Sequence, residues 1–142
     1  MKKFFEIIST GFYIGRLKFG PTIATFLSIP LVLLPQKIFV FLILLIISII
    51  SSYIMVKKTN IKDPQEVVID EILAFFFIFI FIEVSLKNVI LGFLLFRAID
   101  ALKPFPIKLL ENFPYLGILL DDIMASIYVI LILIFYKALL SF

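Results

Sequence analysis

The chain has 142 residues, of which 63% are hydrophobic, compared with about 45–50% in an ordinary soluble domain. Its net charge is only +3, and no run of Lys and Arg is long enough to indicate a nucleic-acid interface. The absence of Cys and His excludes disulfides, thiolate metal sites, Cys nucleophiles and phospho-His intermediates, so any chemistry must use carboxylates, hydroxyls, Lys, Arg or a hard metal ion.

A soluble fold of this size could not bury so much apolar surface, so the composition indicates an integral membrane protein with a single domain over residues 1–142. The first segment, 1–8, combines Lys2 and Lys3 with apolar residues but lacks a compact apolar core and a small-residue cleavage site. We therefore expect it to form a short amphipathic helix at the membrane surface rather than a signal peptide.

Five apolar segments follow, and the clearest is 38–56, which carries no charge and as a helix is about 29 Å long, close to the hydrocarbon thickness of a bilayer. Segment 22–34 is short and contains Pro30, which is expected to kink it. The remaining apolar segments are 72–82, 89–96 and 123–136. The sequence thus predicts an all-α fold, a small integral membrane helical bundle with about four to five membrane-embedded helices, several of them tilted or partly re-entrant.

The charges predict the orientation of this bundle. If the N-terminus is cytoplasmic and all five segments cross, ten of the 13 Lys and Arg residues lie in the cytoplasm, which satisfies the positive-inside rule. The cytoplasmic set is Lys2, Lys3, Arg16, Lys18, Lys57, Lys58, Lys62, Arg97, Lys103 and Lys108, and the outer set is Lys37, Lys87 and Lys137. The same topology puts every acid except Glu83 on the cytoplasmic side, including Asp63, and so locates polar chemistry at the inner membrane face.

Acidic residues recur at the ends of the apolar segments. Each lies within a turn of an apolar helix, where an ionised carboxylate is costly unless it is paired or bound to a metal. Capping of helix N-termini is the simpler interpretation, but a cap does not need two adjacent acids. If the helix ends gather, the carboxylates converge and favour a hard cation such as Mg²⁺ between them. The candidate metal ligands are Asp70, Glu71, Asp100, Asp121 and Asp122.

Two basic residues accompany Asp100. Arg97 shares its helix face, and Lys103 follows directly before Pro104. They form either a local ion pair plus a Lys that extends to the membrane surface, or a cationic site that contacts the phosphate of an anionic headgroup. Cations beside carboxylates suit phosphoryl transfer, in which a carboxylate positions or deprotonates the nucleophile. The candidate catalytic residues are Asp70, Asp100, Asp121 and Asp122.

Segment 15–22 provides a weaker phosphate-binding candidate. It contains Gly15 and Gly20, two bases, and Thr22 at the entry to the first apolar segment. Backbone N–H groups and the Thr22 hydroxyl can contact a phosphate, although a plain basic turn has the same composition. The candidates from this segment are Arg16, Lys18 and Thr22.

These motifs together are similar to those of a known family. The stretch Phe96-Arg97-Ala98-Ile99-Asp100-Ala101-Leu102-Lys103-Pro104-Phe105-Pro106-Ile107 resembles the F-R-x-x-D-x-x-K-P-x-P-I signature of the phosphatidylglycerophosphatase A family. Gly117-Ile118-Leu119-Leu120-Asp121-Asp122-Ile123-Met124-Ala125 resembles its G-x-x-x-D-D-x-x-A element, and Asp70-Glu71 its D-E element. Segment 15–22 approximates its N-terminal loop G-[RK]-L…P-G-T-x-G-S, although Gly20-Pro21-Thr22 and Ala24-Thr25 depart from it.

The resemblance implies a Mg²⁺-dependent hydrolase of phospholipid biosynthesis in the bacterial inner membrane. Its substrate would be phosphatidylglycerophosphate, which it would convert to phosphatidylglycerol. Attack by water and formation of an aspartyl-phosphate intermediate are both open, and the sequence does not indicate an oligomeric state.

Three alternatives compete with this hypothesis. A small channel or transporter subunit would line an acidic ion path with Arg97, Asp100, Asp121 and Asp122, and would need polar residues throughout the bilayer depth. A CDP-alcohol-type lipid transferase would need a D-G-x-x-A-R element, which the sequence lacks. An inactive scaffold would use the acids only as helix caps.

Overall fold

The computed structural model describes residues 2–61 and 64–141, and this part of the chain is all-helical, with seven α-helices, two 3₁₀-helices and no strand. In chain order the elements are α1 (Lys2–Ser9), η1 (Ile14–Arg16), α2 (Gly20–Leu27), η2 (Ile29–Leu33), α3 (Lys37–Thr59), α4 (Ile69–Phe81), α5 (Leu86–Leu102), α6 (Ile107–Leu110) and α7 (Gly117–Leu140). The predicted all-α class is confirmed for these residues. Lys62 and Asp63, which the charge pattern assigned to the cytoplasmic side, lie outside them.

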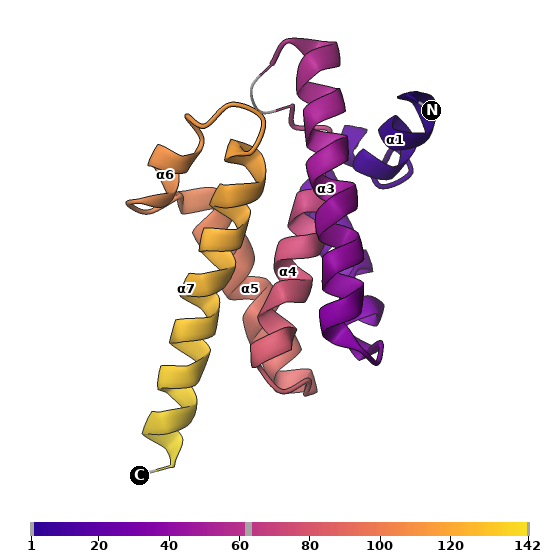
Figure 1. Ribbon diagram of the computed structural model, residues 1–142. Coiled ribbons are helices and arrows are strands. Elements are labelled where there is room, and N and C mark those ends of the chain that lie inside the picture. The colour runs from indigo at the N-terminus through magenta and orange to yellow at the C-terminus, as the bar shows by residue number, and fades with distance from the viewer. Residues whose placement is uncertain (1, 62–63, 142) are drawn as a thin grey trace.

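Four long helices, α3, α4, α5 and α7, run along a common direction and alternate in polarity (Figure 1). Consequently α3 and α5 end at the same end of the bundle where α4 and α7 begin, and α1 and α6 lie at that end as well. We call it the charged end, because it gathers the acidic pairs of α4 and α7 and the Arg97–Lys103 stretch of α5.

Aromatic rings fill the interior below the charged end. Phe75, Phe76 and Phe79 of α4 and Phe96 of α5 are fully buried. The ring centroid of Phe75 lies 5.3 Å from that of Phe79 and 6.1 Å from that of Phe96, which are favourable distances for aromatic pairs. The central helix α4 thus contributes much of the core and holds its own first turn, with Asp70 and Glu71, rigidly at the charged end.

Polar contacts fix the helices around α4. The Ser126 hydroxyl of α7 donates to the carbonyl oxygen of Ala74 at 2.7 Å, so α7 lies against the first half of α4. The Lys37 ammonium at the start of α3 donates to the carbonyl oxygen of Phe79 at 2.7 Å, at the other end of α4. Ser85 caps α5 by accepting from the backbone N–H of Asn88 at 3.2 Å.

Two helices of the described part, α3 and α7, are long and apolar enough to cross a membrane by length and composition. At 13 and 17 residues, α4 and α5 are about 20 and 26 Å long, shorter than the hydrocarbon core of a bilayer. The expected count of four to five membrane-embedded helices is therefore not confirmed. Segment 22–34 is interrupted rather than kinked, because α2 ends at Leu27 and Pro30 lies in the separate 3₁₀-helix η2.

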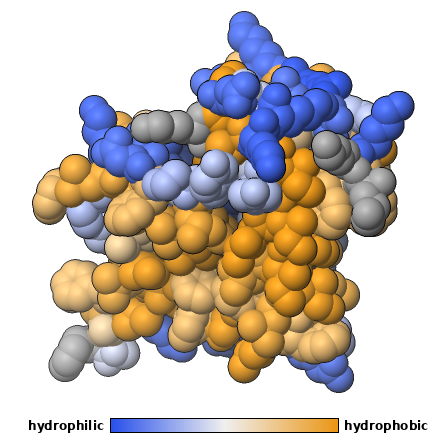
Figure 2. Space-filling model, turned by 45° about the horizontal axis from the view of Figure 1, so that its top comes forward, coloured by the Kyte–Doolittle hydropathy of each residue, from blue (hydrophilic) through white to orange (hydrophobic). Residues whose placement is uncertain are grey.

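The surface of the bundle has an apolar flank and hydrophilic ends (Figure 2). Apolar side chains cover the flank of the bundle, and hydrophilic residues gather mainly at one end, with a few at the other (Figure 2). Helix α1 covers the segment for which the sequence predicts a short N-terminal helix. It lies beside α3 at the charged end and exposes the side chain of Phe4. The segment after α1 then folds back onto residues 66–68, where Val68 donates its backbone N–H to the carbonyl oxygen of Ser9 at 2.8 Å.

Candidate active site

A cavity of about 250 Å³ opens at the charged end, between the N-terminal segment and the ends of α4, α5 and α7. Eight ionisable residues line this charged cavity: Lys18, Asp70, Glu71, Arg97, Asp100, Lys103, Asp121 and Asp122. The structure therefore brings together all five acids that the sequence proposed as metal ligands and catalytic groups, with three of the five proposed phosphate-binding residues.

The four acids of α4 and α7 are buried beneath the opening. Asp70 Oδ1 accepts the backbone N–H of Glu71 at 3.1 Å, and Asp121 Oδ1 accepts that of Asp122 at 3.0 Å. In each pair the first carboxylate is thus anchored to the helix it lies on. Glu71 Oε2 is buried and has no hydrogen-bond partner among the residues that the structure describes. This oxygen is available to a ligand.

Arg97 connects the acids of two helices. Its Nη1 donates to Asp100 Oδ2 at 2.9 Å, one turn along α5, and to Glu71 Oε1 of α4 at 3.4 Å. Its Nε is buried without a hydrogen-bond partner in the described part of the chain. Because a guanidinium carries five N–H donors in a rigid plane, Arg97 is oriented by carboxylates and retains a donor for an incoming anion.

Lys103 forms a second cationic centre. It is the C-cap of α5 in the left-handed conformation (φ 43°), directly before Pro104, so its side chain turns away from the helix axis towards α7. Its ammonium donates to Asp121 Oδ2 at 2.9 Å and also to Glu111, which follows α6. Sequence reasoning missed Glu111, because an acid in a Pro-rich connector has no helical register that relates it to Lys103.

Lys18 belongs to the N-terminal wall of the charged cavity, but Arg16 and Thr22 are not among its lining residues. Arg16 instead binds Glu66 Oε2 through Nε at 2.9 Å and Glu6 Oε1 through Nη2 at 2.7 Å, while Lys58 binds Glu6 Oε2 at 2.6 Å. We call these four residues the N-terminal charge cluster. The hydrogen bond from Lys58, together with Arg16, lowers the pKa of Glu6. The geometry therefore gives no support to Arg16 and Thr22 as phosphate ligands. Through its two ion pairs, Arg16 instead links η1 to α1 and to residue 66.

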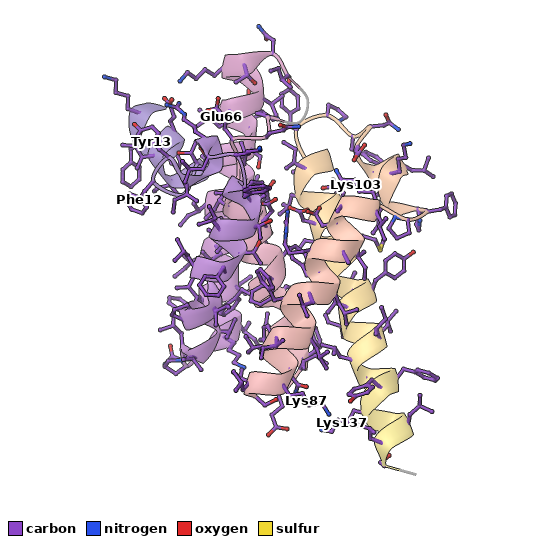
Figure 3. All side chains as sticks on the ribbon, turned by 180° about the vertical axis from the view of Figure 1, so that it is seen from behind. Phe12, Tyr13, Glu66, Lys87, Lys103 and Lys137 are labelled. Atoms are coloured by element: carbon purple, nitrogen blue, oxygen red, sulfur yellow. The ribbon has the colours of Figure 1, made fainter. Side chains whose placement is uncertain are left out.

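Gly15 permits this wall to lie close to the segment that precedes α4. A Cβ atom on Gly15, which lines the charged cavity, would lie 2.0 Å from the carbonyl oxygen of Glu66. Since no side chain fits there, the backbone at Gly15 contacts residue 66 directly. Leu17 and Lys18, which follow shortly after, line the same cavity as the acids of α4. Figure 3 shows Glu66 and Lys103 on the two sides of this region of the charged end.

The donor atoms of the cavity suit a hard divalent cation, because five carboxylates supply oxygen ligands and Glu71 Oε2 is unpartnered. The described residues nevertheless contain no group of three or more acidic side chains arranged to hold a metal ion. Arg97 and Lys103 bind oxygen atoms of Glu71, Asp100 and Asp121 instead. The five predicted carboxylate ligands therefore line one cavity, and their oxygen atoms are of the type that Mg²⁺ prefers. In this arrangement, however, they do not surround a common metal position.

Comparison with known proteins assigns the chain to a family. The family model described as Phosphatidylglycerophosphatase A matches residues 7–137, which is most of the chain. The chain belongs to the phosphatidylglycerophosphatase A family. A curated relative, the Phosphatidylglycerophosphatase A of Haemophilus influenzae, is 34% identical over 91 residues, which cover 58% of this chain and 55% of the relative. The aligned region thus spans about half the length of that relative. No solved structure matches.

The match to the phosphatidylglycerophosphatase A family contains every residue that lines the charged cavity. It also contains Arg16, Lys58 and Glu66 of the N-terminal charge cluster, whereas Glu6 precedes it. Both the cavity and most of the contacts that shape its N-terminal wall therefore lie within the family region.

Proposed function

We propose that the protein is a lipid phosphatase that removes the terminal phosphate of phosphatidylglycerophosphate and leaves phosphatidylglycerol. The observation that carries this proposal is the charged cavity, which combines five carboxylates with Lys18, Arg97 and Lys103 at one end of an apolar bundle. Phosphoryl transfer needs this combination of cations that neutralise phosphate oxygens and a carboxylate beside the nucleophile. The substrate follows from the family and from the name of the relative.

Arg97 and Lys103 are the proposed phosphate ligands. Arg97 is held in place by Asp100 and Glu71 and has its unpartnered Nε for a phosphate oxygen, while Lys103 adds a positive charge from the α5 C-terminus. Lys18 contributes from the N-terminal wall. The three cations arise from two sides of the cavity, so a bound phosphate is neutralised on more than one oxygen.

The carboxylates supply the base or the nucleophile. One of Asp70, Asp100, Asp121 and Asp122 either takes a proton from the attacking water or itself attacks phosphorus, and the P–O bond to the glycerol oxygen breaks in either case. The leaving oxygen then takes up a proton. In the second route, water next hydrolyses the aspartyl phosphate, which releases inorganic phosphate and restores the carboxylate. The buried position of the acidic pairs is compatible with both routes.

Mg²⁺ is part of this proposal, with ligands drawn from Asp70, Glu71, Asp100, Asp121 and Asp122. When bound, it would neutralise developing charge on the phosphate oxygens. The unpartnered Glu71 Oε2 and the all-oxygen donor set support it.

We further propose that the protein lies in the bacterial cytoplasmic membrane as a multi-pass protein with a cytoplasmic N-terminus and charged end. The apolar flank and the two long apolar helices support embedding (Figure 2). Of the described Lys and Arg residues, only Lys37 at the start of α3, Lys87 at the start of α5 and Lys137 near the end of α7 lie at the opposite end of the bundle, which favours a cytoplasmic charged end. A phosphate can then enter from water while the acyl chains stay in lipid.

The channel alternative has less support. An ion path would need polar groups through the bundle, but the interior below the charged cavity is filled by buried Phe75, Phe76, Phe79 and Phe96.

The test is release of inorganic phosphate from phosphatidylglycerophosphate by the purified protein in detergent micelles, with phosphatidic acid and glycerol 3-phosphate as comparison substrates. We expect release from phosphatidylglycerophosphate, loss of release after EDTA treatment, and recovery on addition of Mg²⁺. Absence of release would overturn the proposed activity, whereas release that resists chelation would overturn the role of the metal alone.

A further inference from the structure

A second cavity lies at the end of the bundle opposite the charged end, between the end of α4, the start of α5 and the last turns of α7. It has a volume of about 320 Å³, and we call it the distal cavity. Figure 3 shows two of its lining residues, Lys87 of α5 and Lys137 of α7, close together at the far end of the molecule from Lys103. The distal cavity is therefore separate from the proposed phosphatase site.

The polar side of the distal cavity carries a net positive charge. Lys87 and Lys137 line it together with a single acid, Glu83, and none of the three forms an ion pair with any described residue. The Lys87 ammonium lies 4.8 Å from the centroid of the Tyr136 ring, which keeps it beside α7. Both ammonium groups are thus available to an anion.

The turn that presents Lys87 is fixed. Asn88 Nδ2 donates to the carbonyl oxygen of Glu83 at 2.9 Å, and Ser85 caps the helix through the backbone N–H of Asn88. The start of α5 therefore does not need to reorganise to hold a ligand beside Lys87.

The other walls of the distal cavity are apolar. Leu133 is buried at the cavity, while Phe81, Ile134 and Leu140 are exposed around it. An inorganic anion would use only the lysines, and an uncharged hydrocarbon only these walls. A molecule with an anionic headgroup and acyl chains uses both.

We propose that the distal cavity binds the headgroup region of an anionic phospholipid, with Lys87 and Lys137 at its phosphate and the apolar residues at its acyl chains. This inference rests on the membrane embedding given under the proposed function, and not on the proposed reaction. Lysines near a membrane surface each contribute about 5-fold to the binding of anionic lipid, so the pair contributes roughly 25-fold.

The experiment uses phosphatidylserine, which is anionic but is neither the proposed substrate nor the proposed product. The full-length protein in phosphatidylcholine micelles is titrated with phosphatidylserine, and bound lipid is counted by native mass spectrometry. The variant Lys87→Gln/Lys137→Gln is compared with Lys57→Gln/Lys108→Gln, which removes two lysines at the charged end that do not line the charged cavity. Lys87→Arg/Lys137→Arg keeps both positive charges.

We expect the wild type, the Lys57→Gln/Lys108→Gln variant and the Arg variant to retain phosphatidylserine in preference to phosphatidylcholine, and the Lys87→Gln/Lys137→Gln variant to bind it roughly 25-fold more weakly. Equal binding by that variant and the wild type would overturn the proposal. Displacement of phosphatidylserine by millimolar inorganic phosphate would also overturn it, because the site would then recognise a free anion. Phosphate release from phosphatidylglycerophosphate is measured on the same samples, and we expect the same rate in all variants. The lipid-binding result and the phosphatase result can therefore fail independently of each other.

Discussion

The close approach of Gly15 to residue 66 gives the sharpest structural prediction. In Gly15→Ala the new methyl carbon would lie 2.0 Å from the Glu66 carbonyl oxygen and 3.0 Å from Val68 Cγ1, whereas real Cβ atoms essentially never lie within 3.0 Å of another heavy atom. The two backbone segments must therefore separate by about 1 Å. Overpacking of this kind costs about 1–3 kcal/mol, and a shift of about 1 Å in a catalytic wall can lower the rate roughly 100-fold.

The assay is phosphate release from phosphatidylglycerophosphate, measured as kcat/KM, together with thermal unfolding of the purified protein. We expect Gly15→Ala to lose most of its activity, because the cavity wall that carries Lys18 is displaced. The matched control is Gly92→Ala in α5, where the nearest atom is a ring carbon of Phe79 at 3.3 Å that can shift by a few tenths of an ångström. Wild-type kcat/KM in Gly15→Ala would refute the role assigned to the N-terminal wall.

Four further predictions concern the basic residues and the orientation. Arg97→Gln should lower kcat about 100- to 1,000-fold, as expected for loss of a donor to a charge that develops in the transition state. Arg16→Gln should lower kcat less than about 5-fold, because the Arg16 side chain is 44% exposed, forms ion pairs with Glu6 and Glu66, and does not line the charged cavity. A loss as large as that of Arg97→Gln would restore Arg16 as a phosphate ligand. Lys103→Gln should lower the free energy of unfolding by roughly 3 kcal/mol, since it leaves the buried Asp121 carboxylate without its ammonium partner, and chemical denaturation in detergent measures this loss. Because the chain has no Cys, Lys108→Cys and Ser141→Cys each introduce a single thiol. A membrane-impermeant maleimide added to intact cells should label only the Ser141→Cys variant. Labelling of only the Lys108→Cys variant would contradict the proposed orientation.

The gathering of the acids was predictable from the sequence. Helices that alternate in direction bring the start of one and the end of the next to the same end of a bundle, so Asp70, Asp100 and Asp121 were expected together. The described structure places them on one cavity. The contacts of Arg97 with Asp100 also follow from helical spacing.

Contacts between irregular segments were not predictable in the same way. Arg16 pairs with Glu6 and Glu66, which lie 10 and 50 residues away, and no periodicity relates these positions. The motif suggested a phosphate contact for Arg16, whereas the chain path turns it towards α1. Similarly, the contact between Lys103 and Glu111 depends on the path of the Pro-rich connector through α6.

Helix boundaries were the part of the fold that the sequence predicted least well. Apolar composition alone does not show where an apolar run breaks, and segment 22–34 breaks at Ser28 into α2 and η2. Nor does it separate a helix that spans a bilayer from one that is enclosed by others, as α4 is by α3, α5 and α7. For this reason the number of membrane crossings is best measured directly.

The claim on which the account depends is that the carboxylates at the charged end carry out phosphate release. The most direct measurement is the rate of phosphate release from phosphatidylglycerophosphate by the variant Asp121→Asn/Asp122→Asn. As a control for folding, the variant must insert into the membrane and elute from a size-exclusion column at the same volume as the wild type. We predict that this rate falls to background, because both carboxyl groups at the cavity are replaced by amides of the same size, which can neither act as a base or nucleophile nor bind a metal as a carboxylate does. A rate equal to that of the wild type would contradict the account.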